Sequence, residues 1–140
     1  MKRVSDWERR LAEYFRGCEK LRFKYGQHDC GRFALGAMMV LMGACAPLPP
    51  SYSNAREYRA WVRRCGGLEA AVQTFANDLG LREVPPGMAR RGDAVLLAHD
   101  RKSRVVLGVV ALDGCRAWSP AKLGLVAAPL DRARRAWRVG

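Results

Sequence analysis

The sequence contains few of the residues from which metal sites and disulfide frameworks are built. It has two histidines, His28 and His99, and none of its five cysteines forms a C-x-x-C pair with another. The cysteines are Cys18, Cys30, Cys45, Cys65 and Cys115. An odd count without ligand pairs at zinc spacing disfavours both a disulfide framework and a zinc site. We therefore expect a chain that uses no metal and no other cofactor.

Long apolar runs are also absent. A membrane-spanning helix needs roughly 20 consecutive apolar residues, and the longest candidate, residues 33–48, is interrupted by Gly36, Gly43 and Pro47. The first residues carry no apolar stretch of the signal-peptide kind. We expect no membrane span and a chain made in the cytoplasm. Its 140 residues suit a single domain over residues 1–140.

Acidic residues are scarce relative to basic ones. The chain carries 25 lysines and arginines against 13 acidic residues, a net charge of +12, and the arginines are spread along the sequence. Such a balance is compatible with nucleic acid, an anionic cell envelope or an acidic protein as neighbour, and equally with a solvated surface. The charge alone does not choose among them.

Hydrophobic spacing predicts four helices, at about residues 7–17, 30–42, 55–64 and 68–79. Ser5 and Glu8 have the spacing of a capping box for the first helix. Asp29 and Asn54 are placed to cap the second and third helices, and Gly43 to end the second. The second helix is apolar nearly all round, so we expect it to be central and buried.

The pattern changes near residue 85, where short apolar strands replace helices. Strands are predicted at about residues 93–98, 104–112, 115–118, 123–128 and 136–139. Asp113-Gly114 is a hairpin signal between the second and third of them. Helices followed by a meandering antiparallel sheet predict an α+β domain, with an N-terminal helix in 1–20, a helical part in 21–84 and the sheet in 85–140.

Cys30 is the residue with the clearest chemical potential. It follows Asp29 and opens the apolar helix, which places its thiol on the first helical turn. Backbone N–H groups at a helix N-terminus favour negative charge, so we expect this thiol to ionise more easily than a free one. A thiolate is the nucleophile of cysteine hydrolases. The alternative is a cysteine that only packs in the core.

Six short motifs occur in an order that resembles a known family. They are Gly26-Gln27-His28-Asp29-Cys30, Gly66-Gly67-Leu68, Arg91-Gly92-Asp93, Leu107-Gly108-Val109, Gly124-Leu125-Val126 and Ala136-Trp137-Arg138-Val139. In this order, over about residues 20–140, the chain resembles the NlpC-type papain-like cysteine peptidases, and more closely a phage-encoded offshoot found among tail-tip genes. The resemblance implies a papain-like fold with N-terminal helices packed on a C-terminal antiparallel sheet.

The resemblance also implies a catalytic set, which this chain matches only in part. Active members use a cysteine on a helix N-terminus, a histidine from the adjacent sheet and a polar residue that orients the imidazole. Cys30 matches the nucleophile. The position of the histidine is occupied by Val106, and that of a tyrosine lining the site by Phe23. Neither replacement can transfer a proton.

The two histidines are the remaining candidates for a base. His28 lies two residues before Cys30, and we expect it to point beside the nucleophile. His99 ends the strand before Val106 and would reach Cys30 only in a shifted register. Each also has a plain interpretation, His28 as a loop residue that packs near Asp29 and His99 as a solvated turn residue.

Three functions follow, the first two implied by the resemblance and the third by the basic composition. The first is a structural component of a bacteriophage or phage-like tail tip, a degenerate peptidase-like domain that plugs or closes the hub beside other hub proteins. The second is an active peptidoglycan endopeptidase that uses Cys30 with His99 or His28 to open the cell wall during DNA entry. The third is a small basic nucleic-acid-binding protein, with phosphate contacts from residues 132–138 but no motif for specific binding. The first places the chain in the virion after synthesis in the bacterial host cytoplasm.

Overall fold

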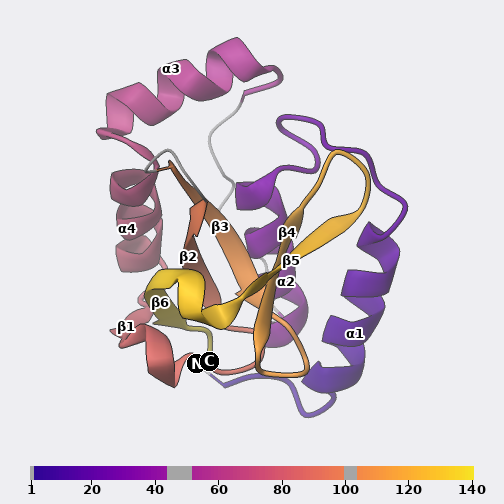
Figure 1. Ribbon diagram of the computed structural model, residues 1–140. Coiled ribbons are helices and arrows are strands. Elements are labelled where there is room, and N and C mark those ends of the chain that lie inside the picture. Colours follow the sequence, from indigo (N-terminus) through magenta and orange to yellow (C-terminus); the bar gives the residue numbers. More distant parts are fainter. Residues whose placement is uncertain (1, 44–51, 100–103) are drawn as a thin grey trace.

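In the part of the chain that the computed structural model describes, residues 2–43, 52–99 and 104–140, four α-helices precede a six-stranded antiparallel sheet (Figure 1). The helices are α1 (Trp7–Cys18), α2 (Cys30–Met42), α3 (Ala55–Cys65) and α4 (Leu68–Asp78). The strands are β1 (Arg82–Val84), β2 (Ala94–His99), β3 (Arg104–Val110), β4 (Arg116–Pro120), β5 (Leu125–Pro129) and β6 (Ala133–Arg138). The predicted α+β class is confirmed.

Local capping chemistry sets the bounds of α2 and α3. The Asp29 carboxylate accepts a hydrogen bond from the Arg32 N–H at 2.9 Å, and Gly43 ends α2 in the left-handed region at φ +65°. The Asn54 side chain accepts from the Glu57 N–H at 2.9 Å and so caps α3. These caps satisfy backbone groups that a helix end leaves unpaired, and both predictions are confirmed.

The capping box predicted for α1 is wrong. The residue at the N-cap is Asp6, and neither its side chain nor that of Ser5 caps the helix. The Asp6 carboxylate instead pairs with Arg9 at 2.6 Å and Arg10 at 2.8 Å. Two arginines within one turn therefore compete with the backbone N–H groups for this carboxylate.

The sheet has the strand order β1-β6-β2-β3-β4-β5. Strands β2 to β5 form the predicted meander, but β6 returns to pair with β2 and separates it from β1. Strand β1 was missed in the sequence because it has only three residues, two of them charged. Strand β6 begins three residues earlier than predicted, at Ala133.

The helices cover one face of this sheet and leave a smaller core on the other. Helix α2 packs against β3 and β4, with α1 on its outer side and α4 beside it over β3 (Figure 1). The opposite face is covered by two short 3-10 turns, η1 (Pro86–Met88) and η3 (Leu130–Arg132). Helix α2 is central as predicted, and the packing of α1 on one side and the sheet on the other explains why it is apolar around most of its circumference. None of the described helices is long and apolar enough to cross a membrane.

Candidate functional site

Cys30 lies where strands β3 and β4 separate. In the described residues these strands pair only at Val109–Trp118 and Val110–Ala117, so the earlier part of β3 is not bonded to β4. The first turn of α2 fills this gap. A backbone hydrogen bond from Leu107 consequently reaches the Cys30 sulfur. The sheet thus holds the thiol by its backbone rather than by a catalytic side chain.

A pocket of about 220 Å³ opens beside the thiol. Apart from Asp29, Cys30 and Ser119, its lining is aromatic or aliphatic, and among the described side chains it includes no histidine. Both replacement residues identified in the sequence, Val106 and Phe23, lie in this lining. The structure therefore brings Cys30, Val106 and Phe23, the three positions that the resemblance singles out, together in one pocket.

The electrostatic surroundings keep Cys30 protonated. Burial raises the pKa of the Cys30 thiol, and the neighbouring Asp29 carboxylate raises it further. Hydrogen bonds from Leu107 and from the Tyr58 hydroxyl act in the opposite direction but do not outweigh burial. The expectation that the helix N-terminus makes this thiol ionise easily is therefore wrong, because the helix-end contribution is smaller than the cost of burying a thiolate.

Asp29 is fully occupied by structural contacts. Its carboxylate accepts hydrogen bonds from the N–H groups of Gly26 and Arg32, at 2.8 and 2.9 Å, and from the Tyr52 hydroxyl at 2.9 Å. The residue is buried. It fixes the loop before α2 and so the position of Cys30.

His28 makes its side-chain contacts outside the Cys30 pocket. Its buried imidazole forms a backbone hydrogen bond with Gly124 and meets the Phe33 ring edge-on at 6.3 Å between centroids. His28 does not line the Cys30 pocket. Burial lowers the pKa of His28, more than the hydrogen bond and Asp29 raise it. These contacts tie the loop before α2 to the β4–β5 hairpin.

Only the backbone of His99 belongs to the described part of the structure. It ends β2 opposite Arg104, two residues beyond Leu97, which pairs with Val106. Its side chain lies outside the described part of the structure, as does Cys45. A Cys30–His99 pair accordingly stays a prediction.

The comparison with known protein families accounts for nearly the whole chain. Residues 2–139 match a family described as a domain of unknown function, DUF6950. This chain belongs to the DUF6950 family. A search of curated proteins found no match. The family match thus sets the extent of the DUF6950 domain at residues 2–139.

Two residues of the pocket were not singled out as site residues in the sequence. Tyr58, from α3, lines the pocket beside Cys30 and lowers the pKa of the thiol, and burial raises the pKa of Tyr58 itself so that the phenol remains protonated. Ser119, on β4, is buried and lines the same pocket. The proximity of Tyr58 to Cys30 depends on how α3 packs on α4, which no local sequence pattern gives. No sequence signal distinguishes Ser119 from other strand serines.

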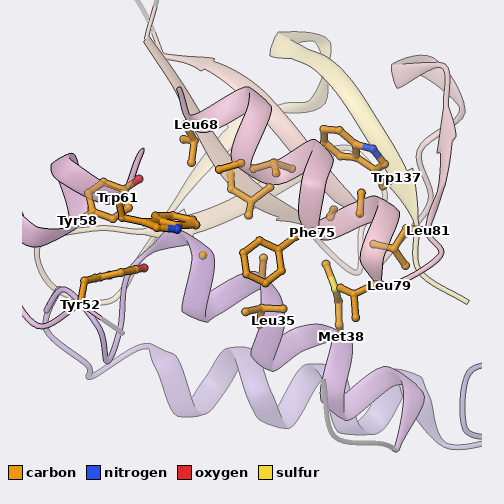
Figure 2. A pocket seen from close by; sticks show the side chains of 17 residues that line it. Leu35, Met38, Tyr52, Tyr58, Trp61, Leu68, Phe75, Leu79, Leu81 and Trp137 are labelled. Carbon is orange, nitrogen blue, oxygen red and sulfur yellow. The ribbon is translucent and has the colours of Figure 1, made fainter. Parts of the chain in front are cut away.

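Behind Tyr58 the DUF6950 domain contains a second, apolar cavity of about 60 Å³. Figure 2 shows Phe75 between Tyr52, Tyr58 and Trp61 at one end and Leu81 and Trp137 at the other. Tyr58 and Leu68 line both spaces, so they separate this cavity from the Cys30 pocket. Apart from Tyr52 and Tyr58, none of the side chains that line this cavity is titratable. In the described residues, no group of three or more His, Cys, Asp and Glu gathers at any one place.

Proposed function

We propose that this protein is a papain-like domain of the NlpC type that has lost peptidase activity and serves as a structural component of a phage or phage-like tail tip. In that position it would plug or close the hub, within the virion, beside other hub proteins. The observation that carries the proposal is the composition of the Cys30 pocket, in which Val106 and Phe23 replace the residues that an active member uses.

The chemistry of the pocket supports the loss of activity. A cysteine nucleophile needs a base within hydrogen-bond reach or a thiolate that is already formed. Cys30 has a raised pKa, and the groups that favour its thiolate are the backbones of Leu107 and Gly31 and the Tyr58 hydroxyl, none of which accepts a proton from the thiol. A protonated thiol among valines and aromatic rings is a weak nucleophile.

The arrangement of elements supports the papain-like assignment. The candidate nucleophile begins a central helix, this helix packs on an antiparallel sheet, and the strand that carries Val106 passes beside it. Such an arrangement is compatible with the papain-like fold that the motif order implies. The tail-tip location rests on the motif resemblance, and the net charge of +12 suits contacts with acidic neighbours in an assembly.

The proposal is tested in the particle that encodes the chain by replacing Cys30 with serine. Serine keeps the shape of the side chain but removes the thiol, so we expect assembly, infectivity and the amount of this protein in purified tails to remain unchanged. Cys65→Ser, a change of the same type in α3, serves as the matched control. Deletion of the gene should yield particles that are incomplete at the tail tip.

Two results would contradict the proposal. Absence of the protein from purified, infectious particles would remove the structural role. Particles that carry Cys30→Ser, assemble normally and fail to deliver DNA would instead point to an active peptidoglycan endopeptidase, particularly if the purified unaltered protein releases soluble fragments from isolated cell walls and the variant does not.

A further inference from the structure

A hollow of about 530 Å³ lies at the far end of α2 from Cys30 and is lined by four arginines. Arg3 comes from the N-terminal segment, Arg90 and Arg91 from the loop before β2, and Arg138 from the end of β6. Val4 hydrogen-bonds to Leu41 near the end of α2, which brings these segments together. The hollow is therefore separate from the Cys30 pocket.

One buried carboxylate holds two of the four guanidinium groups. Arg3 Nη2 lies 3.0 Å from Asp93 Oδ1, and Arg138 Nε lies 2.9 Å from Asp93 Oδ2. The same carboxylate accepts hydrogen bonds from two backbone N–H groups, at 2.9 and 3.1 Å. Asp93 thus accepts four hydrogen bonds and has no capacity left to neutralise Arg90 or Arg91.

The other two arginines leave an excess of positive charge. Arg91 pairs at 3.0 Å with Glu8, a side chain that is 59% exposed. The Arg90 guanidinium makes no ion pair or side-chain hydrogen bond within the described segments. Burial lowers the pKa of Arg3, and repulsion from Arg138, Arg90 and Arg91 lowers it further against the opposing effect of Asp93. A third acid in the lining, Asp113, pairs with Arg116 at 2.7 Å, so the four guanidinium groups outnumber the carboxylates that pair with them.

Trp7 holds two of these groups in place. The guanidinium carbon of Arg3 lies 4.4 Å from the centroid of the Trp7 ring, and that of Arg91 lies 5.2 Å from it. Cation–π contacts of this kind orient the flat guanidinium group before a ligand arrives. Because Arg91 is already ordered, its side chain loses less conformational entropy when a ligand binds to it.

We propose that this hollow binds carboxylate groups from an acidic segment of a partner protein. Guanidinium groups match a carboxylate through paired hydrogen bonds, and Glu8 already places one carboxylate against Arg91. Glu8 and Asp113 border the hollow and compete with any anionic ligand, so the positive charge open to a partner is confined to a few guanidinium groups. The inference does not depend on the role of Cys30.

The test is an NMR titration of the full chain with an acetylated and amidated pentaglutamate peptide, followed through the indole N–H signal of Trp7, which Trp7→Phe assigns. We expect a saturable shift of this signal. Arg90→Ala should weaken binding roughly tenfold, since a hydrogen bond to a charged group is lost. Glu8→Gln should tighten binding because it removes the competing carboxylate.

Arg64→Ala is the matched control, because it removes the same charge from an exposed position of α3 and should change the affinity less than about twofold. The Arg90 side chain makes no contact that the fold requires, so its variant should keep the amide spectrum of the folded protein. Equal weakening by the two variants, or a Trp7 signal that does not move, would overturn the proposal. Tighter binding of a thymidine pentanucleotide than of the peptide would also overturn it, by assigning the hollow to nucleic acid.

Discussion

The Cys30 thiol shows two opposing effects on a single ionisable group. A helix N-terminus stabilises a negative charge by about 0.3–1 kcal/mol at an exposed position. Burial acts against the thiolate, and here it prevails, so the pKa of Cys30 is raised. The Tyr58 hydroxyl and the Leu107 N–H satisfy the sulfur without supplying a base. A position at a helix N-terminus is therefore not sufficient to lower the pKa of a buried thiol.

Asp93 is the residue on which the junction of the two chain ends depends. It is fully buried and forms ion pairs with Arg3, early in the sequence, and with Arg138, in the last strand. Removing its charge leaves two arginines, each at most 13% exposed, without their counter-ion. Such unpaired buried charges are among the costliest defects in a protein interior.

We therefore predict that Asp93→Asn lowers the free energy of unfolding by about 3–5 kcal/mol. The measurement is urea denaturation followed by circular dichroism. Asp78→Asn, at the exposed end of α4, removes the same charge and should leave the midpoint nearly unchanged. Similar losses in both variants would contradict the role assigned to Asp93.

At the scale of the elements, the helices were more predictable than the sheet. The ends of α2 depend on Asp29 and Gly43, which act within one turn, so the sequence alone places them correctly. The pairing of β6 between β1 and β2 joins segments about 50 residues apart and leaves no local mark. For the same reason the place of Cys30 at the start of α2 could be predicted, whereas its proximity to Tyr58 could not.

Helices α1 and α2 approach each other closely at Gly36. The Tyr14 hydroxyl donates to the Phe33 carbonyl at 2.8 Å and occupies the space that a Cβ atom at residue 36 would need. The Tyr14 ring stacks on Phe33 at 5.7 Å. A glycine inside α2 thus allows the two helices to pack at this distance.

Gly36→Ala should destabilise the protein by about 1–3 kcal/mol, because overpacking outweighs the gain in helix propensity. Gly17→Ala provides the control, since no atom lies within 4 Å of its added Cβ and the change should stabilise α1 by roughly 0.5–1 kcal/mol. Thermal unfolding of both variants measures the difference. A stabilised Gly36→Ala protein would show that the helices can move apart at no cost.

His28 links the loop before α2 to the β4–β5 hairpin, and this link should depend on pH. Burial lowers the pKa of His28 in the folded protein, so the unfolded chain binds the proton more readily. The contribution of His28 to stability is therefore fully present above about pH 6.5, the pKa of a histidine in the unfolded chain, and decreases as the pH falls below that value.

We predict that His28→Gln weakens this decrease, measured by unfolding at a series of pH values between about 7.5 and 5.5. His99→Gln removes the other histidine and should retain the contribution of His28. An unaltered protein with the same stability across this range would contradict the burial of a neutral imidazole at this position.

Considered as a whole, the molecule carries two different surfaces at the two ends of α2. The end near Cys30 has a largely apolar pocket beside α3, and the other end has the arginine-lined hollow, where Arg3 lies against Val139 and Gly140. The composition predicted a basic protein but not the concentration of four arginines around Asp93. That cluster joins residues 3, 90, 91 and 138, which only the fold brings together.

The proposed loss of peptidase activity depends on Cys30 being without a base. The most direct measurement is the rate at which Cys30 is alkylated by iodoacetamide at about pH 6, where only an activated thiol reacts quickly. We predict that Cys30 reacts no faster than the exposed Cys115, and that His99→Ala leaves its rate unchanged. Rapid alkylation of Cys30 at this pH, slowed by His99→Ala, would contradict the account and establish an active cysteine–histidine pair.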